Sequence, residues 1–230
     1  MLENKFLARV FLAALVALSA APITSAAEQW TEGKNYFPIQ PTQHTNVAPG
    51  KVEVLEVFSY ACPACNAFNP YIQQLRRVLP PNAQMNYLPA SFRPDEDWVM
   101  FQRAFFAAQA LGIVDKTHDA LYDAVWEPEA PLATMDSSGT RLKNPLPTIE
   151  DAAKVYNHLA GVPADKFIAT AKSFSVDLNM KKADAMVLAS QVDSTPTVIV
   201  NGKYRVTPGS AGGPNQLIEL VKYLVARETK

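Results

Sequence analysis

Cysteine is scarce in this sequence: Cys62 and Cys65 are the only two among 230 residues. Two cysteines are too few for a disulfide-stapled scaffold, and a chain of this length can bury an apolar core without such bonds. Stabilisation of the fold therefore does not account for the pair. Histidine is also rare, and because His44, His118 and His158 are isolated from one another in the sequence, we expect no metal site.

Charge of one sign and long apolar runs are lacking as well. The formal net charge is -1, from 21 basic and 22 acidic residues, so the chain has no basic footprint for nucleic acid. A membrane-spanning helix needs roughly 20 consecutive apolar residues. No run of this length follows the amino-terminal segment, and we expect the mature part to be soluble.

The amino-terminal segment has the pattern of a cleavable secretory signal. Lys5 and Arg9 precede an apolar run over residues 10–21, which Pro22 ends, and small residues follow. This order is typical of signals that are removed after export, and the run is short for the alternative, an uncleaved membrane anchor. We predict that residues 1–26 are a signal peptide, cleaved after Ala26 or Ala27. Exported thiols can be oxidised.

The two ends of the mature chain have the patterns of strands. A short strand is predicted over residues 36–40, a central strand over 51–60 and a second core strand over 84–89, with a helix over 66–79 between the last two. In TPTVIVNGKYRV, residues 195–206, the pair Asn201-Gly202 between two apolar runs predicts a hairpin. An amphipathic helix around residues 217–224 closes the chain.

The middle of the chain has helical periodicity. Trp98, Phe101 and Phe105 recur at helical spacing, and Thr148 is a candidate N-cap for a later helix. We interpret these apolar stripes as helix-bundle core rather than a cofactor pocket. Residues 127–147 are rich in proline and lack periodicity, which predicts a long surface loop to which we assign no role.

The cysteines lie in YACPACN, where the central strand ends and a helix begins. Pro63 suits the first helical position, so the first-turn N–H groups and the helix dipole should stabilise a thiolate at Cys62. Cys65, one turn further on, should be more buried and keep a higher pKa. A stabilised thiolate is a good leaving group, which makes the disulfide oxidising. A redox role is thus favoured over half of a metal site or a structural clip, whose short loop would stabilise little.

Two further positions are candidates for this site. Thr195-Pro196 precedes an apolar strand, where proline is normally excluded. A cis bond there would leave the Thr195 backbone free to pair with an extended peptide, and a trans proline at an edge strand is the alternative. Glu56 lies within the apolar run VLEVF, either facing solvent or half-buried beneath the cysteines as a proton-tuning group. An apolar rim for unfolded peptide is suggested by Tyr60, Ala61 and Ala64, and a place in the core is the alternative for Tyr60.

The sequence resembles the DsbA family of bacterial periplasmic thiol:disulfide oxidoreductases. The resemblance covers nearly all of the mature chain and is carried by VLEVFSYACPAC, LGIVDK, TPTVIVNGKYRV and the late VKYL helix. It implies an α/β protein, a thioredoxin fold with an all-helical domain inserted. The first thioredoxin part would span residues 27–94, the insertion 95–185 with the proline-rich loop 127–147, and the second thioredoxin part 186–230.

The resemblance also implies an activity in the periplasm. The Cys62–Cys65 disulfide, without another cofactor, would be donated to reduced or unfolded exported proteins through a mixed disulfide. Cys62 would be the exposed nucleophile and Cys65 its partner, supported by Pro63, Ala64, Glu56, Thr195 and Pro196. A DsbB-like membrane quinone reductase would reoxidise the pair, and we expect a monomer.

Two departures from the family pattern leave other functions open. Ala64 stands where the best-known members have histidine, and Thr195 replaces a common valine, as in isomerase relatives. A disulfide isomerase or reductase of the same fold is therefore an alternative. The second alternative belongs to a different class: an exported chaperone-like binding protein with an inert structural disulfide.

Overall fold

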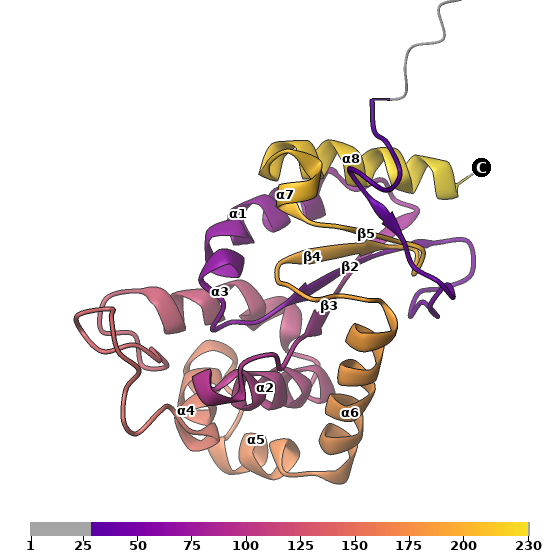
Figure 1. Ribbon diagram of the computed structural model, residues 1–230. Coiled ribbons are helices and arrows are strands. Elements are labelled where there is room, and N and C mark those ends of the chain that lie inside the picture. The colour runs from indigo at the N-terminus through magenta and orange to yellow at the C-terminus, as the bar shows by residue number, and fades with distance from the viewer. Residues whose placement is uncertain (1–28, 230) are drawn as a thin grey trace, which may run out of the picture.

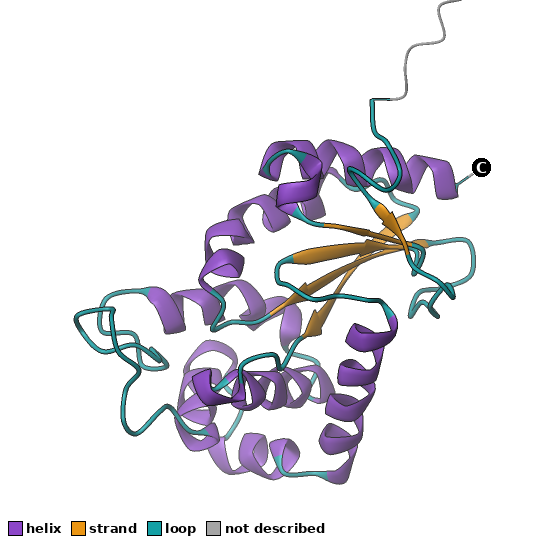
Figure 2. Ribbon diagram, in the orientation of Figure 1, coloured by secondary structure: helices purple, strands orange, loops and turns teal. Residues whose placement is uncertain are grey.

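A five-stranded mixed sheet separates two layers of helices. The computed structural model describes residues 29–229, and the predicted signal peptide, residues 1–26, lies outside them (Figures 1 and 2). The strand order is β1-β5-β4-β2-β3. The strands span Phe37–Pro38 (β1), Val52–Phe58 (β2), Ala83–Pro89 (β3), Thr197–Val200 (β4) and Tyr204–Val206 (β5).

Strand β2 is an interior strand, as its run of apolar residues predicts. All seven of its residues are buried. It pairs in parallel with β3 and antiparallel with β4, so that Glu56 lies opposite Tyr87 on one side and Val198 on the other. This double pairing satisfies the strand's backbone polar groups and holds the peptide segment that leads to the cysteines.

The predicted hairpin is confirmed between β4 and β5. Asn201 and Gly202 have φ angles of 53° and 64°, the left-handed conformation that an Asn-Gly turn requires. Gly202 is also in close contact with the preceding chain: a Cβ at this position would collide with the carbonyl oxygen of Gln43. The turn therefore needs glycine for two reasons, its backbone angle and its lack of a side chain.

One face of the sheet is covered by two long helices. Helix α1 (Pro63–Val78) and helix α8 (Pro214–Glu228), preceded by the short α7 (Pro208–Ala211), lie on this side in Figure 1. Val54 of β2 and Val200 of β4 pack there in one apolar cluster with Ile72 and Leu75 of α1 and Leu217 of α8. This layer anchors the helix that begins at the cysteine pair.

The other face carries the helical part of the chain. Leu55 and Val57 belong to a second apolar cluster, with Phe101 and Phe105 from the helices. The helices are α2 (Trp98–Ala110), α3 (Val114–Trp126), α4 (Ile149–Ala160), α5 (Ala164–Ala171) and α6 (Phe174–Ala189), with the short 3-10 helix η1 (Pro94–Glu96) before them. The expected domain boundary after residue 185 lies within α6, and the division into domains stays a prediction.

Local sequence signals account for several helix ends. Thr148 caps α4 as predicted, in a capping box in which its side chain accepts from the Asp151 N–H.

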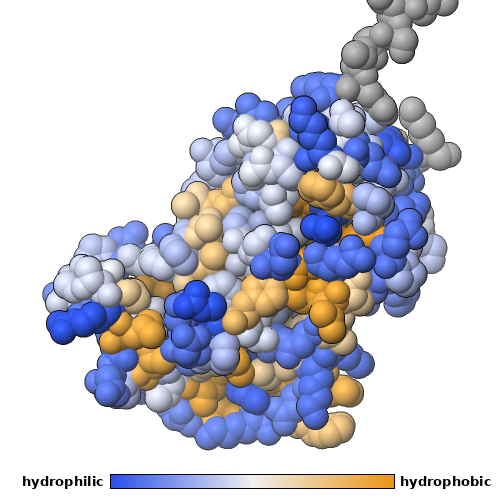
Figure 3. Space-filling model, viewed as in Figure 1, coloured by the Kyte–Doolittle hydropathy of each residue, from blue (hydrophilic) through white to orange (hydrophobic). Residues whose placement is uncertain are grey.

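None of the helices within residues 29–229 is long and apolar enough to cross a membrane. Exposed apolar side chains, Leu188 among them, occur in the helical part, and Figure 3 shows apolar surface gathering where the helical and sheet layers meet.

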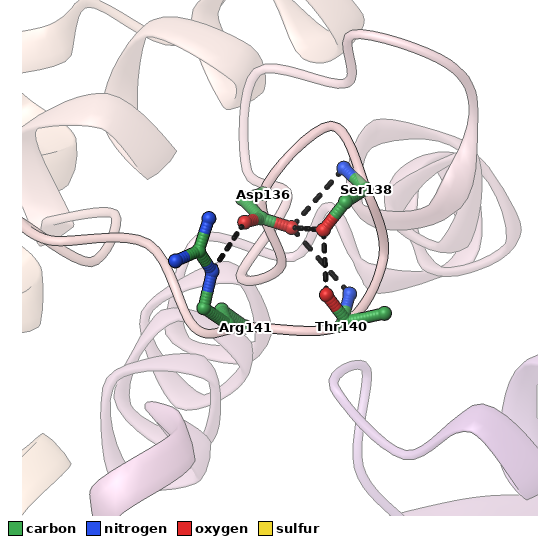
Figure 4. A network of polar contacts seen from close by, with 4 residues as sticks. All are labelled: Asp136, Ser138, Thr140 and Arg141. Carbon is green, nitrogen blue, oxygen red and sulfur yellow. Dashed lines mark hydrogen bonds and ion pairs between the residues drawn. The ribbon is translucent and has the colours of Figure 1, made fainter.

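The proline-rich segment 127–147 contains a small ordered hairpin. Asp136 organises it: one carboxylate oxygen accepts hydrogen bonds from the N–H groups of Ser138 (3.1 Å) and Thr140 (3.4 Å) and from the Ser138 hydroxyl, and the other faces Arg141 Nε at 3.3 Å (Figure 4). Leu132, near the start of the segment, is completely buried. The predicted loop therefore has local structure that its lack of periodicity did not indicate.

Candidate active site at the start of helix α1

The cysteine pair lies where β2 ends and α1 begins, as predicted. Cys62 is the N-cap residue of α1 and Pro63 occupies the first helical position. Both cysteines are free thiols. Cys62 is 5% exposed and Cys65 is completely buried, while Pro63 and Ala64 between them are exposed. The predicted exposure of Cys62 is therefore wrong, because the residue is buried, and access to the pair is limited to its 5% exposed surface.

Donors from two distant parts of the chain surround the Cys62 sulfur. The Cys65 N–H lies 3.4 Å from Cys62 Sγ, and the Thr195 hydroxyl donates to the same sulfur over 3.2 Å. The Cys62 thiol in turn faces the Thr195 carbonyl oxygen at 3.6 Å. The hydrogen bonds that the Cys62 sulfur accepts from the Cys65 N–H and the Thr195 hydroxyl are stronger when the sulfur is charged. They therefore stabilise a thiolate at Cys62.

The two thiols differ in pKa for physical reasons that the structure shows. The hydrogen bond from the Cys65 side chain is the largest influence on Cys62, whose pKa falls from 9.0 to about 6 although burial opposes the change. The Thr195 hydroxyl and the N–H groups of Cys65 and Ala64 lower it further. Burial and the hydrogen bond to Cys62 raise the pKa of Cys65 well above 9.0. The helix start contributes, as predicted, but side chains contribute more.

The predicted proline lies beside the cysteines. The Thr195-Pro196 bond is cis. Pro196 directly precedes β4, which begins at Thr197, so proline stays outside the hydrogen-bonded strand. The contacts of Thr195 with Cys62 join two segments that are 133 positions apart in the sequence.

Glu56 is buried, which excludes the solvent-facing alternative. It is 1% exposed, and neither of its carboxyl oxygens has a hydrogen-bond partner among the described residues. Burial is the main reason that its pKa rises from 4.5 to about 8, followed by the negative charges of Asp119 and Cys62, while Arg76 lowers it. Glu56 is therefore protonated near neutral pH. The negative charge of Glu56 would raise the pKa of Cys65, and the Cys62 thiolate raises the pKa of Glu56 in turn.

Comparison with known proteins assigns this arrangement to a family. The sequence matches the family described as Thioredoxin over residues 48–219. The Thiol:disulfide interchange protein DsbA of Pseudomonas aeruginosa is 33% identical over 219 residues, which cover 95% of each chain. This chain belongs to the DsbA family.

Solved structures of DsbA proteins have the same fold. The crystal structure of Pseudomonas aeruginosa DsbA superposes with a TM-score of 0.72 at 33% identity and covers 88% of this chain and 96% of that one. The DsbA of Xylella fastidiosa also gives a TM-score of 0.72, at 29% identity, and covers 85% of this chain and 96% of that one. The predicted family, fold and enzyme class are confirmed: the protein is a DsbA-family thiol:disulfide oxidoreductase.

The predicted rim at Tyr60 is wrong for this DsbA-family protein. Tyr60 is 2% exposed, and its hydroxyl pairs with His118 Nδ1 at 2.9 Å inside the helical part. Ala61 is also buried, so only Ala64 of the three expected rim residues is exposed. An aromatic residue next to an active site can pack into the core, and the sequence alone left both positions open for Tyr60.

Several side chains around the DsbA-family site were not expected from the sequence. Trp126 Nε1 donates to the Tyr60 carbonyl oxygen at 2.7 Å and ties the end of α3 to the segment before Cys62. Arg76 of α1 donates to the Tyr87 hydroxyl at 3.0 Å and pairs with Asp119 of α3 at 2.7 Å. These contacts join residues far apart in the chain, and no local motif marks them.

The described part of the chain contains no cluster of metal-ligand side chains. No group of three or more His, Cys, Asp or Glu side chains within residues 29–229 could hold a metal ion. His118 is buried and packs on the Tyr87 ring, with a centroid separation of 3.9 Å. Burial lowers its pKa to about 3, so His118 is neutral and acts as a packed polar core residue.

Proposed function

We propose that this protein is a dithiol oxidase that donates its Cys62–Cys65 disulfide to newly exported proteins in the periplasm. The observation that supports the proposal most directly is the asymmetry of the pair. Cys62 retains access to solvent and three kinds of donor that favour its thiolate, while Cys65 is sealed in the core. A pair of this kind favours the reduced dithiol and so gives its disulfide away.

In the proposed first step, a client thiolate attacks Cys62 Sγ of the oxidised protein. The Cys62–Cys65 bond breaks, a mixed disulfide forms with Cys62, and Cys65 leaves with the electron pair. Because its pKa is raised, the Cys65 sulfur takes up a proton. Glu56 is the buried acid that can supply this proton, since its pKa of about 8 keeps it protonated near neutral pH.

In the second step, another client thiolate attacks the client sulfur of the mixed disulfide. The client is oxidised by two electrons, and Cys62 is released as a thiolate, for which its pKa of about 6 makes it a good leaving group. The protein ends as the dithiol. We propose that a DsbB-like membrane quinone reductase restores the disulfide, and that the protein acts as a monomer after removal of residues 1–26.

A transfer assay tests the proposed reaction. Oxidised protein is mixed with a reduced, unfolded client that has two cysteines, and acid-quenched samples are analysed by mass for mixed and client disulfides. We expect stoichiometric oxidation of the client and its loss in Cys62→Ser. Absence of transfer, or transfer that persists in Cys62→Ser, contradicts the proposal.

A redox titration distinguishes the oxidase from a reductase of the same fold. The protein is equilibrated with mixtures of reduced and oxidised glutathione, and the dithiol fraction is measured by alkylation. We expect a potential well above the roughly -270 mV of a thioredoxin-type reductase. A potential at or below that value favours the reductase, to which Thr195 and Ala64 also point.

A further inference from the structure

A large cavity lies between the sheet and the helical layer and reaches Glu53 near the start of β2. It has a volume of about 940 Å³ and is lined by residues of β2, β3, α2 and α6 and of the loop before β2. Glu53, one of the lining residues, lies near the start of β2. Because a strand rises about 3.3 Å per residue, it is about 17 Å along the strand from Phe58, and the cysteines follow after Phe58. Cavities of this size between structural layers are typical of small-molecule sites.

The lining of this cavity is mixed, with an apolar part from the sheet and the helices and charged groups that face solvent. Leu55, Phe105, Phe106 and Met186 form apolar lining from the sheet and the helices. The charged or titratable side chains at its rim are exposed: His44, Asp115 and Lys182. Tyr87, which also lines the cavity, is held by Arg76, and its raised pKa of about 12 keeps it neutral.

Glu53 is the buried acidic group in this lining. It is 2% exposed, and its Oε1 atom accepts hydrogen bonds from the Asn46 N–H at 3.1 Å and from Asn86 Nδ2 at 2.6 Å. No residue that the structure describes donates to Oε2. The Oε2 atom is not among the fully buried oxygens that lack a partner, so this carboxylate is hydrogen-bonded at Oε1 and accessible at Oε2. The free oxygen belongs to a side chain that lines the cavity.

We propose that this cavity binds an ammonium or guanidinium group carried on an apolar stem. The cation pairs with Oε2 of Glu53, and the stem lies against Leu55, Phe105 and Met186. An anionic head group would be repelled by the buried carboxylate, and Lys182 is exposed at the rim rather than buried beside it. The cation comes from a lysine or arginine side chain of a polypeptide or from a free alkylamine. This site shares no residue with the redox pair.

Titration of the folded, reduced protein with octylamine tests the site, with octan-1-ol as the uncharged probe. Binding is followed by calorimetry and by the NMR signal of the Asn86 side-chain amide, which contacts Glu53. We expect octylamine to bind about tenfold more tightly than octanol, as for one charge-assisted contact. Glu53→Gln should lose about this factor for the amine only, while Asp115→Asn at the rim should change it less than about twofold.

Equal affinities for amine and alcohol, or unchanged amine binding in Glu53→Gln, would overturn the proposal. If Glu53→Gln does not fold, Ala189→Phe narrows the cavity with the carboxylate intact and must weaken amine binding.

Competition by acetyl-Leu-Lys-Leu-amide, but not by its norleucine analogue, identifies a polypeptide as the source of the cation. Competition by free amines alone identifies a small molecule. Disulfide transfer by Glu53→Gln should be unchanged, so this test and that of the proposed function can fail separately.

Discussion

The two cysteines are three positions apart but lie in different environments. Cys62 is the N-cap residue of α1 and accepts from the Thr195 hydroxyl, whereas Cys65 lies on the first turn of α1 and is completely buried. The sulfur that a client can reach is thus the one with the lower pKa. This pairing of access with thiolate character gives the two atoms separate roles in exchange.

Replacement of Thr195 by valine tests the side-chain contribution to this asymmetry. Thr195→Val removes the hydroxyl that donates to Cys62 Sγ over 3.2 Å. A hydrogen bond to a charged group contributes about 1.5–3 kcal/mol, so we expect the pKa of Cys62 to rise from about 6 by about one pH unit. The rate of iodoacetamide alkylation as a function of pH measures it.

Thr197→Val is the matched control, because the Thr197 hydroxyl donates to the Ser194 carbonyl and does not touch sulfur. This variant should leave the pH profile of Cys62 alkylation unchanged. Thr195→Ser keeps a hydroxyl, so its profile should lie close to that of the wild type. An unchanged profile in Thr195→Val would show that the backbone and Cys65 alone hold the thiolate.

Glu56 should make the stability of the fold depend on pH. Its pKa is about 8 in the folded protein and 4.5 when unperturbed, so between these values the folded state binds a proton that the unfolded state has lost. Folding stability therefore falls as pH rises through this window. Glu56→Gln removes this dependence, and its free energy of unfolding relative to the wild type should increase by about 1.4 kcal/mol per pH unit between about pH 5 and pH 7.5.

Urea unfolding of the reduced proteins at several pH values measures this difference. The comparison with the wild type cancels the opposing effect of His118, whose lowered pKa favours the folded state as pH rises. Glu219→Gln is the control, since Glu219 is exposed and pairs with Lys222 at the surface. A constant difference between Glu56→Gln and the wild type would mean that Glu56 is ionised in the folded protein.

At the scale of elements, segment 127–147 begins directly after a helix end that contacts the peptide leading to the cysteines. Trp126 ends α3 and bonds to the carbonyl oxygen of Tyr60, so the long segment starts from a point attached to the redox site. Its hairpin is held by polar contacts around Asp136, in addition to the backbone bridge between Met135 and Leu142. The order of this segment therefore rests on the Asp136 side chain together with backbone hydrogen bonds, such as that from the Asp136 N–H to the Arg141 carbonyl oxygen.

Asp136→Ala should loosen the hairpin without unfolding the protein. The Ser138 and Thr140 amides lose their acceptor, and hydrogen exchange at these two amides should accelerate by roughly tenfold, as for the loss of one hydrogen bond. Because the segment is exposed, the global free energy of unfolding should change by less than about 0.5 kcal/mol.

Ser137→Ala is the control in the same turn, since Ser137 is exposed and takes no part in the hydrogen bonds of the Asp136 carboxylate. Exchange measured by NMR at both amides should be unchanged in this variant. Equal exchange rates in Asp136→Ala and the wild type would assign the order of the hairpin to its backbone bonds alone.

For the whole molecule, redox state and stability are linked. A thiol whose pKa is about 6 in the folded protein and 9.0 when unperturbed favours the folded dithiol by about 1 kcal/mol at pH 7. The disulfide closes a very short loop and contributes little chain entropy. We therefore expect the reduced protein to be more stable than the oxidised one.

Guanidinium unfolding of both forms tests this expectation. Because the folded pKa of Cys62 is depressed, the contribution is lost as pH falls through about 6 and grows as pH rises toward 9. The midpoint of the reduced form should exceed that of the oxidised form near pH 8, and the two should converge near pH 5. An oxidised form that is more stable throughout this range would identify the disulfide as a structural clip.

The sequence by itself determined those features that depend on neighbouring residues. The strand that ends at CPAC, Pro63 at the first helical position, the Asn201-Gly202 hairpin and the capping by Thr148 all follow from periodicity, backbone preference and local hydrogen bonds. These interactions span a few positions of the chain, so a linear pattern is enough to predict them. The family resemblance rested on the same local motifs.

Only the tertiary structure decided the properties that depend on burial and on distant contacts. Glu56 became a protonated core acid, Tyr60 became core rather than rim, and Thr195 reached the Cys62 sulfur from 133 positions away. The cavity around Glu53 likewise exists only because the sheet and the helical layer meet beside it. Desolvation and long-range hydrogen bonds set these properties, and both depend on which segments pack together, which adjacent residues do not reveal.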